Sequence, residues 1–121
     1  MPTGLAGVAD VLIGGEADLN AAMPKGRSPG TEPLILLAHE GDYADQIVGS
    51  GVDLMLAGHT HGGQVRIPFV PPFQLPPLGE KYLEGLFSVG DLKLYVTRGV
   101  GTVGVPFRFR CPPEITVITL V

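Results

Sequence analysis

Residues 34–63 read LILLAHEGDYADQIVGSGVDLMLAGHTHGG, and this stretch decides the fold class. Residues 34–38 form a continuous apolar run, the pattern of a strand buried on both faces of a sheet, and residues 52–57 predict a second buried strand. Between them, residues 43–48 favour a short helix that ends at Gly49. A strand, a helix and a second strand in this order usually form a parallel, right-handed unit. The sequence therefore predicts an α/β fold.

The segments before and after this unit are assigned in the same way. Residues 4–13 are apolar and bounded by Gly, which predicts a strand followed by a turn at Ala9-Asp10. Residues 16–23 favour a helix, because apolar residues recur at helical spacing and acidic residues lie in the expected first turn. Residues 66–81 contain five prolines, a density that excludes a helix or an inner strand. We therefore expect a long loop there.

The C-terminal third predicts a second group of strands. We expect strands at residues 83–89, 92–97 and 114–120, because apolar and β-branched residues dominate these segments. Gly90-Asp91 is suited to a tight hairpin turn between the first two.

The bulk composition is that of a globular protein. The chain has 121 residues, one domain by length, with 45% hydrophobic and 17% charged residues. Its net charge of −4 argues against a nucleic-acid partner, because phosphate binding usually requires a basic excess. A single cysteine, Cys111, fits a reducing compartment. There is no apolar run of membrane-spanning length and no signal-peptide pattern at the start, so we expect a cytoplasmic protein.

All three histidines of the chain follow the two central strands. His39 comes after the run at 34–38, and His59 and His61 come after the run at 52–57. Parallel strands end at the same edge of a sheet, where open α/β folds bind ligands. An extended backbone would also point His59 and His61 to the same side, because they are two residues apart. Imidazole is a good ligand for zinc, manganese or iron, so the pattern predicts a metal site, although a histidine with ordinary hydrogen bonds is the alternative.

Three other polar residues each have two interpretations. Arg98 lies in a glycine-rich turn, where it either contacts a substrate phosphate or bonds to loop carbonyls. Gln64 follows the histidines and, with Arg66, either lines the substrate rim or has an ordinary loop role. Asp42 either caps the helix at 43–48 or orients a histidine ring, and the helix cap is the simpler assignment.

Two motifs resemble the calcineurin-like metallophosphoesterase family. Residues 58–64, GHTHGGQ, match its closing Gly-His-x-His motif. Residues 36–42, LLAHEGD, resemble its preceding single-histidine motif, although near relatives usually have Pro where this chain has Gly41. Residues 78–82, 97–102 and 108–115 resemble a bacterial subgroup that includes membrane-associated phosphodiesterases. The resemblance covers nearly the whole chain and implies the C-terminal half of an α/β sandwich with mixed β-sheets, with residues 1–121 as one partial domain.

The resemblance implies hydrolysis of phosphoester bonds by two divalent metal ions, with Mn, Zn or Fe as candidates. By the family pattern, His39 and His59 bind one ion and His61 binds the other. The family's first three motifs, Asp-x-His, Gly-Asp and Gly-Asn-His, do not occur in this sequence. No residue of this chain is therefore expected to be catalytic. We expect the chain alone to bind metal weakly and to hydrolyse little or nothing.

The expected partners follow from the same resemblance. The substrate is a phosphoester, and a lipid-linked phosphate is one candidate. The apolar residues of the loop at 68–78 contact either a membrane surface or the missing half of the fold. Sheet edges and faces without their cover predict self-association or association with that half. The alternative to an enzyme is a non-catalytic half-domain that folds, self-associates and binds metal weakly.

Overall fold

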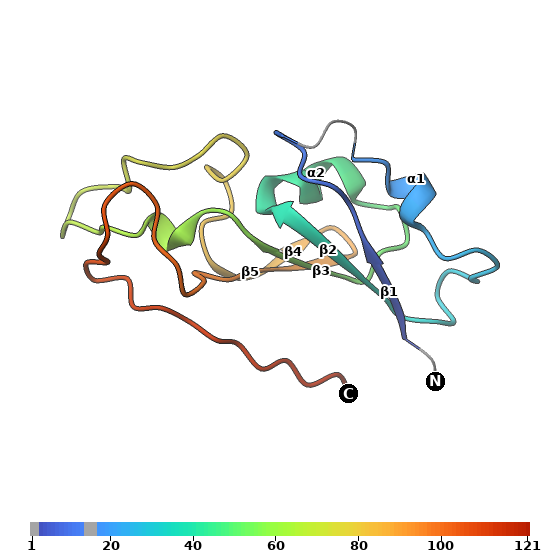
Figure 1. The fold of residues 1–121 in the computed structure, drawn as a ribbon. Coiled ribbons are helices and arrows are strands. Elements are labelled where there is room, and N and C mark those ends of the chain that lie inside the picture. Colours follow the sequence, from blue (N-terminus) through green and yellow to red (C-terminus); the bar gives the residue numbers. More distant parts are fainter. Residues whose placement is uncertain (1–2, 14–16) are drawn as a thin grey trace.

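The computed structural model describes residues 3–13 and 17–121, and its centre is one five-stranded β-sheet (Figure 1). The strand order across the sheet is β1 (Gly4–Gly7), β2 (Leu34–Glu40), β3 (Leu54–Gly58), β5 (Leu92–Val96) and β4 (Gly85–Val89). The first four of these run parallel, and β4 is antiparallel to β5. The α/β class with a mixed sheet is confirmed.

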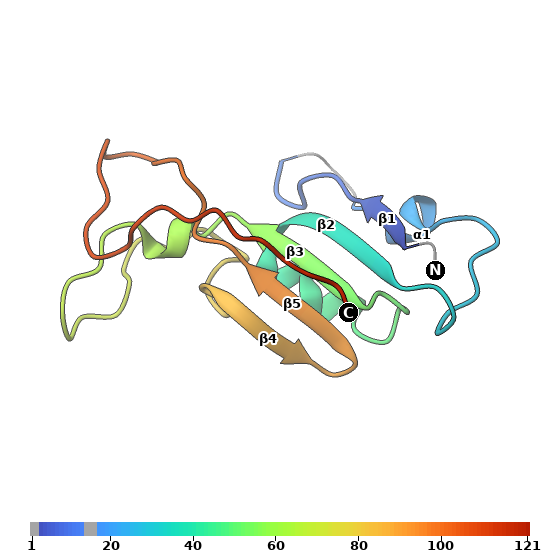
Figure 2. The same cartoon turned by 90° about the horizontal axis from the view of Figure 1, so that it is seen from below.

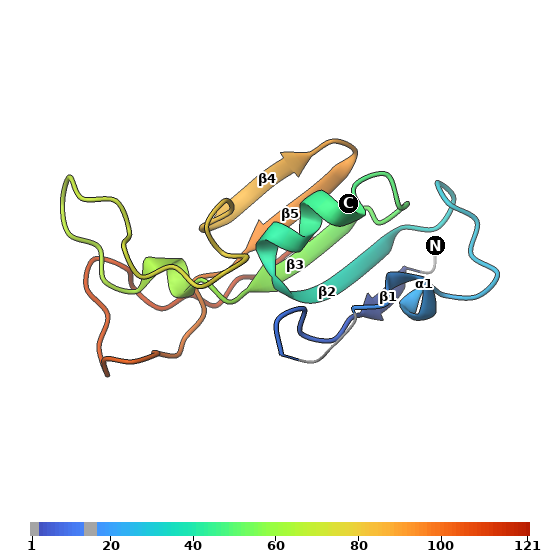
Figure 3. The ribbon, with the colours of Figure 1, turned by 90° about the horizontal axis from the view of Figure 1, so that it is seen from above.

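The helices are short, and the segment that contains α2 lies over one face of the sheet (Figures 1 and 3). They are α1 (Leu19–Ala22), α2 (Ala44–Ile47) and the 3₁₀ turns η1 (Gly41–Tyr43) and η2 (His61–Gly63). Asp18 caps α1, since its side chain accepts the backbone N–H of Ala21 at 2.9 Å. This helix is shorter than the expected 16–23, and residue 16 lies outside the described residues. Gly49 follows α2 with a φ of 79°, the left-handed conformation that ends helices.

The core lies between the sheet and the segment η1–α2. Alternate residues of β2, namely Leu34, Leu36 and Ala38, are buried on this face. Met55 pairs with Leu36 and Leu94 pairs with Met55, and both are fully buried beside it. Tyr43, Ala44 and Ile47 cover them from the helical side. The strand–helix–strand unit and β5 therefore build this core together.

The opposite face of the sheet is apolar but poorly covered. Leu37, Leu56, Tyr95 and Leu86 are paired in register across β2, β3, β5 and β4, so they share this face. Leu37 is 44% exposed and Leu86 is 67% exposed. We call this surface the open face.

The C-terminal tail corrects one expectation. Residues 114–120 form no strand; the tail runs along the open face instead of pairing at a sheet edge (Figures 1 and 2). Tyr95 bonds to the side chains of Glu114 and Thr116, and the Glu114 N–H donates to the Gly99 carbonyl at 2.9 Å. The hydroxyls of Thr116 and Tyr95 both donate to the Glu114 carboxylate and lower its pKa, with the Thr116 bond as the main cause and the Tyr95 bond next. The apolar and β-branched residues were a misleading signal because the tail's backbone has no strand beside it in the plane of the sheet.

The remaining assignments differ only in their bounds. The hairpin turn is confirmed, with Gly90 at a φ of 61° between β4 and β5. Residues 66–81, which we call the proline loop, contain neither helix nor strand. β2 is two residues longer than expected and includes His39 within the strand.

The expected helix cap at Asp42 is wrong. Its carboxylate accepts the backbone N–H groups of Glu80, Lys81 and Tyr82, each at 3.0 Å. Asp42 therefore fastens the end of the proline loop to η1, and within the described part of the chain it has no hydrogen bond to a histidine.

Candidate metal centre

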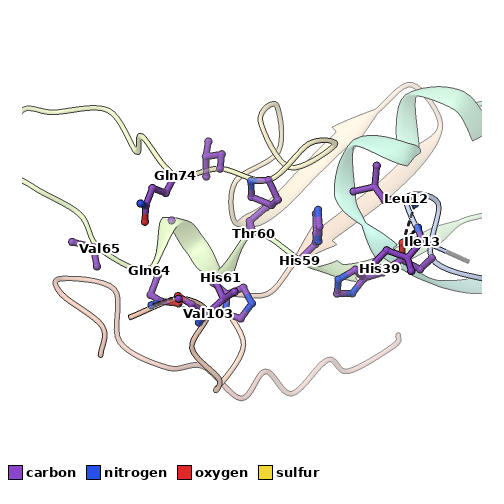
Figure 4. Close-up of a pocket in the computed structure, with 15 residues that line it drawn as sticks. Leu12, Ile13, His39, His59, Thr60, His61, Gln64, Val65, Gln74 and Val103 are labelled. Carbon is purple, nitrogen blue, oxygen red and sulfur yellow. Dashed lines mark hydrogen bonds between the residues drawn. The ribbon is translucent and has the colours of Figure 1, made fainter. Parts of the chain in front are cut away.

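The three histidines line one pocket of about 550 Å³ at the carboxyl ends of β2 and β3 (Figure 4). His39 comes from β2, and His59 and His61 come from the segment that follows β3. Asp10, from the turn after β1, lines the same pocket. The topology places these groups together, because the parallel strands end at the same edge.

His39 and His59 are direct neighbours. Their ring centroids are 4.7 Å apart, and the rings are inclined by 66°. The two residues are twenty positions apart in sequence, so the strand pairing and not local geometry brings them together. This is the contact that the single-histidine and Gly-His-x-His motifs predicted.

The backbone around the last two histidines is not extended, so the expected reason for their common direction is wrong. His59 has a φ of 69° and His61 a φ of 51°, both in the left-handed region that non-glycine residues rarely adopt. Thr60 lies between them, donates its hydroxyl to the carbonyl of Leu83 at 2.7 Å and accepts the N–H of Gly62 at 3.1 Å. Such conformations cost free energy and persist where surrounding contacts enforce them, typically at functional sites.

The hydrogen bonds of the rings suit metal ligands. His59 Nε2 lies 2.9 Å from the carbonyl oxygen of Pro77, so the neutral ring that donates there leaves Nδ1 as its lone-pair nitrogen. A metal-binding histidine usually donates its other ring N–H to a carbonyl or carboxylate in this way. His61 Nδ1 is buried and has no hydrogen-bond partner among the described residues. A buried polar atom without a partner is costly, and a cation is one group that would satisfy it.

The three rings do not form a complete binding site. Among residues 3–13 and 17–121, no three His, Cys, Asp or Glu side chains are close enough together to hold one metal ion. His61 shares the pocket with the His39–His59 pair without joining it in such a cluster. The donors present fit partial coordination shells only.

A buried carboxylate supports the His39 side of the pocket, and no sequence pattern signalled it. Glu40 is fully buried and accepts the N–H groups of Val11 at 3.2 Å and Leu12 at 3.3 Å. Asp10 accepts the N–H groups of Leu12 at 2.9 Å and Ile13 at 2.8 Å. The Ile13 bond is the main cause that lowers the pKa of the Asp10 carboxyl. These bonds fix the turn at 10–13 against the end of β2.

His61 is held through its backbone. Arg108 Nη1 donates to the His61 carbonyl at 3.3 Å, and the buried Cys111 thiol lies 3.4 Å from the same oxygen. Gly62 packs between Cys111 and Arg98, and a Cβ there would lie 2.6 Å from Arg98 Cγ and 2.8 Å from Cys111 Sγ. No local pattern marks Arg108 and Cys111 as supports of His61, because they are about fifty residues away from it in the chain.

Gln64 lies on the pocket but is bonded to protein. Its side chain is 6% exposed, and its amide bonds to the backbone of Val103, Val105 and Phe107. Its contact with substrate stays a prediction. The structure shows a loop-holding role for it.

Arg98 does not line the pocket. It pairs with Glu114 at 3.0 Å and Glu84 at 3.5 Å, and Arg66 pairs with Glu84 at 2.6 Å. Its phosphate contact also stays a prediction, and its carboxylate partners offset the charge that such a contact needs.

The comparisons with known proteins agree with this architecture. The chain is 49% identical over 86 residues to the uncharacterized metallophosphoesterase YkuE of Bacillus subtilis, an alignment that covers 71% of this chain and 30% of YkuE. It is 39% identical over 109 residues to the phosphodiesterase YaeI of Escherichia coli, which covers 88% of this chain and 40% of YaeI. A transmembrane protein with metallophosphoesterase domain from Danio rerio is 38% identical over 91 residues, covering 73% of this chain and 20% of the relative.

The parallel sheet with histidines at its carboxyl edge defines a class of α/β protein with a candidate metal centre. The chain belongs to the calcineurin-like metallophosphoesterase family. It spans only about 30% to 40% of the length of the first two relatives. No family model and no solved structure matches it. No helix among the described residues is long and apolar enough to cross a membrane.

Proposed function

We propose that this chain supplies part of the metal site of a phosphodiesterase, and that His39, His59 and His61 are ligands of two divalent metal ions. The observation that supports this most directly is the pocket itself, where His39 and His59 are in contact and the buried His61 Nδ1 has no partner among the described residues. Divalent ions bound there would polarise a phosphoester and balance its negative charge. Mn, Zn and Fe all accept imidazole nitrogen.

The chain's own residues then have structural tasks. Pro77, through its carbonyl, fixes the His59 ring and leaves Nδ1 toward the cation. Arg108 and Cys111 hold the His61 backbone in its left-handed conformation. Glu40 and Asp10 hold the turn beside His39. None of these groups is assigned a proton transfer.

The isolated chain is expected to bind metal weakly, because three neutral donors lack the carboxylates that stabilise a pair of cations. A calorimetric titration with Zn²⁺ measures this. A tight isotherm with two ions per chain would contradict the proposed division of the site.

The proline loop supports a further part of the proposal, a lipid-linked substrate or a peripheral membrane contact. Phe69 is fully exposed and Phe73 is 61% exposed, and residues 67–79 contain no charged side chain. Both features suit an apolar surface. Sedimentation with phosphatidylcholine vesicles checks this contact, with wild-type protein in the pellet and a Phe69→Ser/Phe73→Ser variant in the supernatant. Equal distribution of the two proteins would exclude it.

The function itself is tested in the full-length protein with Mn²⁺ and bis(p-nitrophenyl) phosphate. The His59→Ala variant is expected to lose about 100-fold or more in kcat/KM, since even contacts behind a metal ligand are worth about 10- to 100-fold. Gln46→Ala is the control, because Gln46 is exposed on α2, away from the pocket. Unchanged activity and metal content in His59→Ala would refute the proposed role.

The second candidate is a non-catalytic half-domain that folds and self-associates. The observation that favours it is the open face, where Leu37 and Leu86 remain exposed. Hydrolysis by the wild-type full-length protein, abolished in His59→Ala, would decide for the enzyme.

A further inference from the structure

Gln64 fastens residues 99–107, which we call the valine loop, beside the histidine pocket. We propose that Gln64 is a positioning residue, and that the loop it holds selects phosphodiesters whose second ester group is apolar and uncharged. The proposal rests on the proposed function, because it concerns ligands of the same pocket.

The contact uses both ends of the Gln64 amide. Its nitrogen lies 3.1 Å from the carbonyl oxygen of Val103, 2.9 Å from that of Val105 and 3.1 Å from that of Phe107. Its oxygen accepts the N–H of Val103 at 2.8 Å. One side chain therefore bonds to three residues of a loop about forty positions away in the chain.

These bonds do not close a core. Residues 100–107 are all exposed, so burial of apolar surface cannot fix the loop in place. Gln64 itself is buried and has a φ of 50°, a left-handed conformation that is unusual for a residue with a side chain. Strain of this kind is retained where a precise placement is enforced by its surroundings. Gln64 therefore places the valine loop, whose residue Val103 lines the histidine pocket (Figure 4).

The placed loop forms an apolar wall. Val103 and Gly104 line the pocket together with Leu75 and Pro76 of the proline loop. No Lys or Arg lines the pocket among the described residues. Such a wall favours the burial of an apolar group and offers no partner to a second negative charge, which would lose its water there without compensation. A phosphodiester with an aromatic or long alkyl substituent meets both conditions, whereas the methyl groups of dimethyl phosphate offer little apolar surface to bury.

The ends of the loop have an anchor of their own. Arg108 donates to the carbonyls of Arg98 at 2.7 Å, Gly99 at 3.2 Å and Gly101 at 3.0 Å, as well as to that of His61. Loss of the Gln64 bonds therefore frees the middle of the valine loop while His61 stays braced. This separation lets the role of the wall be measured apart from the metal ligands.

The test compares wild-type full-length protein with Gln64→Glu, which keeps the shape but cannot donate to the three carbonyls, and with Gln64→Leu, which removes the bonds without adding charge. Gln46→Glu is the matched control on α2. Hydrogen exchange should show faster exchange of the Val103 amide in both Gln64 variants and not in the control. Calorimetry should show about tenfold weaker binding of diphenyl phosphate, the size of effect that a displaced apolar wall produces, and a change within about twofold for dimethyl phosphate.

Unchanged exchange of the Val103 amide in the Gln64 variants would overturn the proposal. An equal loss of affinity for diphenyl and dimethyl phosphate in these variants would also overturn it. So would equal affinity of the wild-type protein for the two phosphates, which includes the case that it binds neither. The metal site is checked by loading the protein with Co²⁺ and recording the absorption of the bound ion. Loss of this absorption in the Gln64→Leu variant would show that the residue acts on the metal ligands and would also overturn the proposal. None of these measurements requires hydrolysis of bis(p-nitrophenyl) phosphate. Failure of the proposed function can therefore be told apart from failure of the proposed role of Gln64.

Discussion

Gly62 is more tightly packed than Gly58 and Gly63, the other glycines beside the histidines. Its φ is 61°, and it is packed between Arg98 and Cys111, the side chains that lie against the loop carrying His61. A side chain there meets two separate penalties, an unfavourable backbone conformation and a steric clash. The neighbouring sequence positions His59 and His61 already carry the first of these.

We therefore expect Gly62→Ala to lower the free energy of unfolding by about 2–4 kcal/mol, the sum of a left-handed alanine and an overpacked site. Gly99→Ala is the control, because Gly99 has a φ of 70° but no atom within 4 Å of the point where an alanine methyl group would lie, so only the backbone penalty applies. Urea unfolding of both variants measures the difference. Equal losses would show that the clash with Arg98 and Cys111 is relieved.

At the scale of elements, a few polar side chains hold the long loops. Gln64 holds the valine loop, and Asp42 holds the end of the proline loop through three backbone N–H groups. Since loops of this length lose much conformational entropy on ordering, each such anchor carries a large share of the local order.

Replacement of Asp42 by Ala is expected to cost about 1–3 kcal/mol and to speed hydrogen exchange at residues 80–82, because three N–H groups lose a charged acceptor. The matched control is Asp45→Ala on α2, which removes an exposed ion pair with Lys81 and a bond from Tyr82. Such surface pairs contribute at most about 1 kcal/mol. A greater loss in Asp45→Ala than in Asp42→Ala would contradict this ranking.

At the scale of the whole molecule, the sheet is covered on one side only. The helical side has a buried core, whereas the open face is crossed only by the extended tail among the described residues (Figure 2). Exposed apolar surface of this kind, bordered by the edge strands β1 and β4, favours association with another chain or another segment.

The isolated chain is accordingly expected to self-associate. A Leu37→Glu/Leu86→Glu variant places charge on the open face, at β2 and at the edge strand β4, and should shift the mass measured by light scattering toward the monomer. Val100→Glu is the control, since Val100 is 66% exposed but lies in the valine loop. A wild-type chain that is already monomeric at high concentration would refute the expectation.

The sequence predicted what depends on short-range pattern. The two apolar runs, their parallel pairing and the meeting of His39 with His59 follow from local periodicity and one topological rule. The Glu40 contacts with Val11 and Leu12 could not be predicted from the sequence, because no local pattern marks which distant N–H a carboxylate will accept.

Asp42 shows how a local signal misleads. An aspartate just before a helix is typical of a cap, yet the N–H groups at 80–82, nearly forty residues away, bind its carboxylate instead. The tail shows the same for strands, because the apolar and β-branched residues at 114–120 say nothing about whether a neighbouring backbone is within reach.

The spacing of the contacts also has a consequence for the order of assembly. The bond from the Leu34 amide to Asp53, at the base of β2 and β3, spans 19 residues, whereas the bonds from Gln64 to the valine loop span 39 to 43. Shorter chain closures cost less entropy and form sooner during folding. A cation supplied to the refolding chain would thus encounter the imidazoles of His39 and His59 before the valine loop has taken its place beside the pocket.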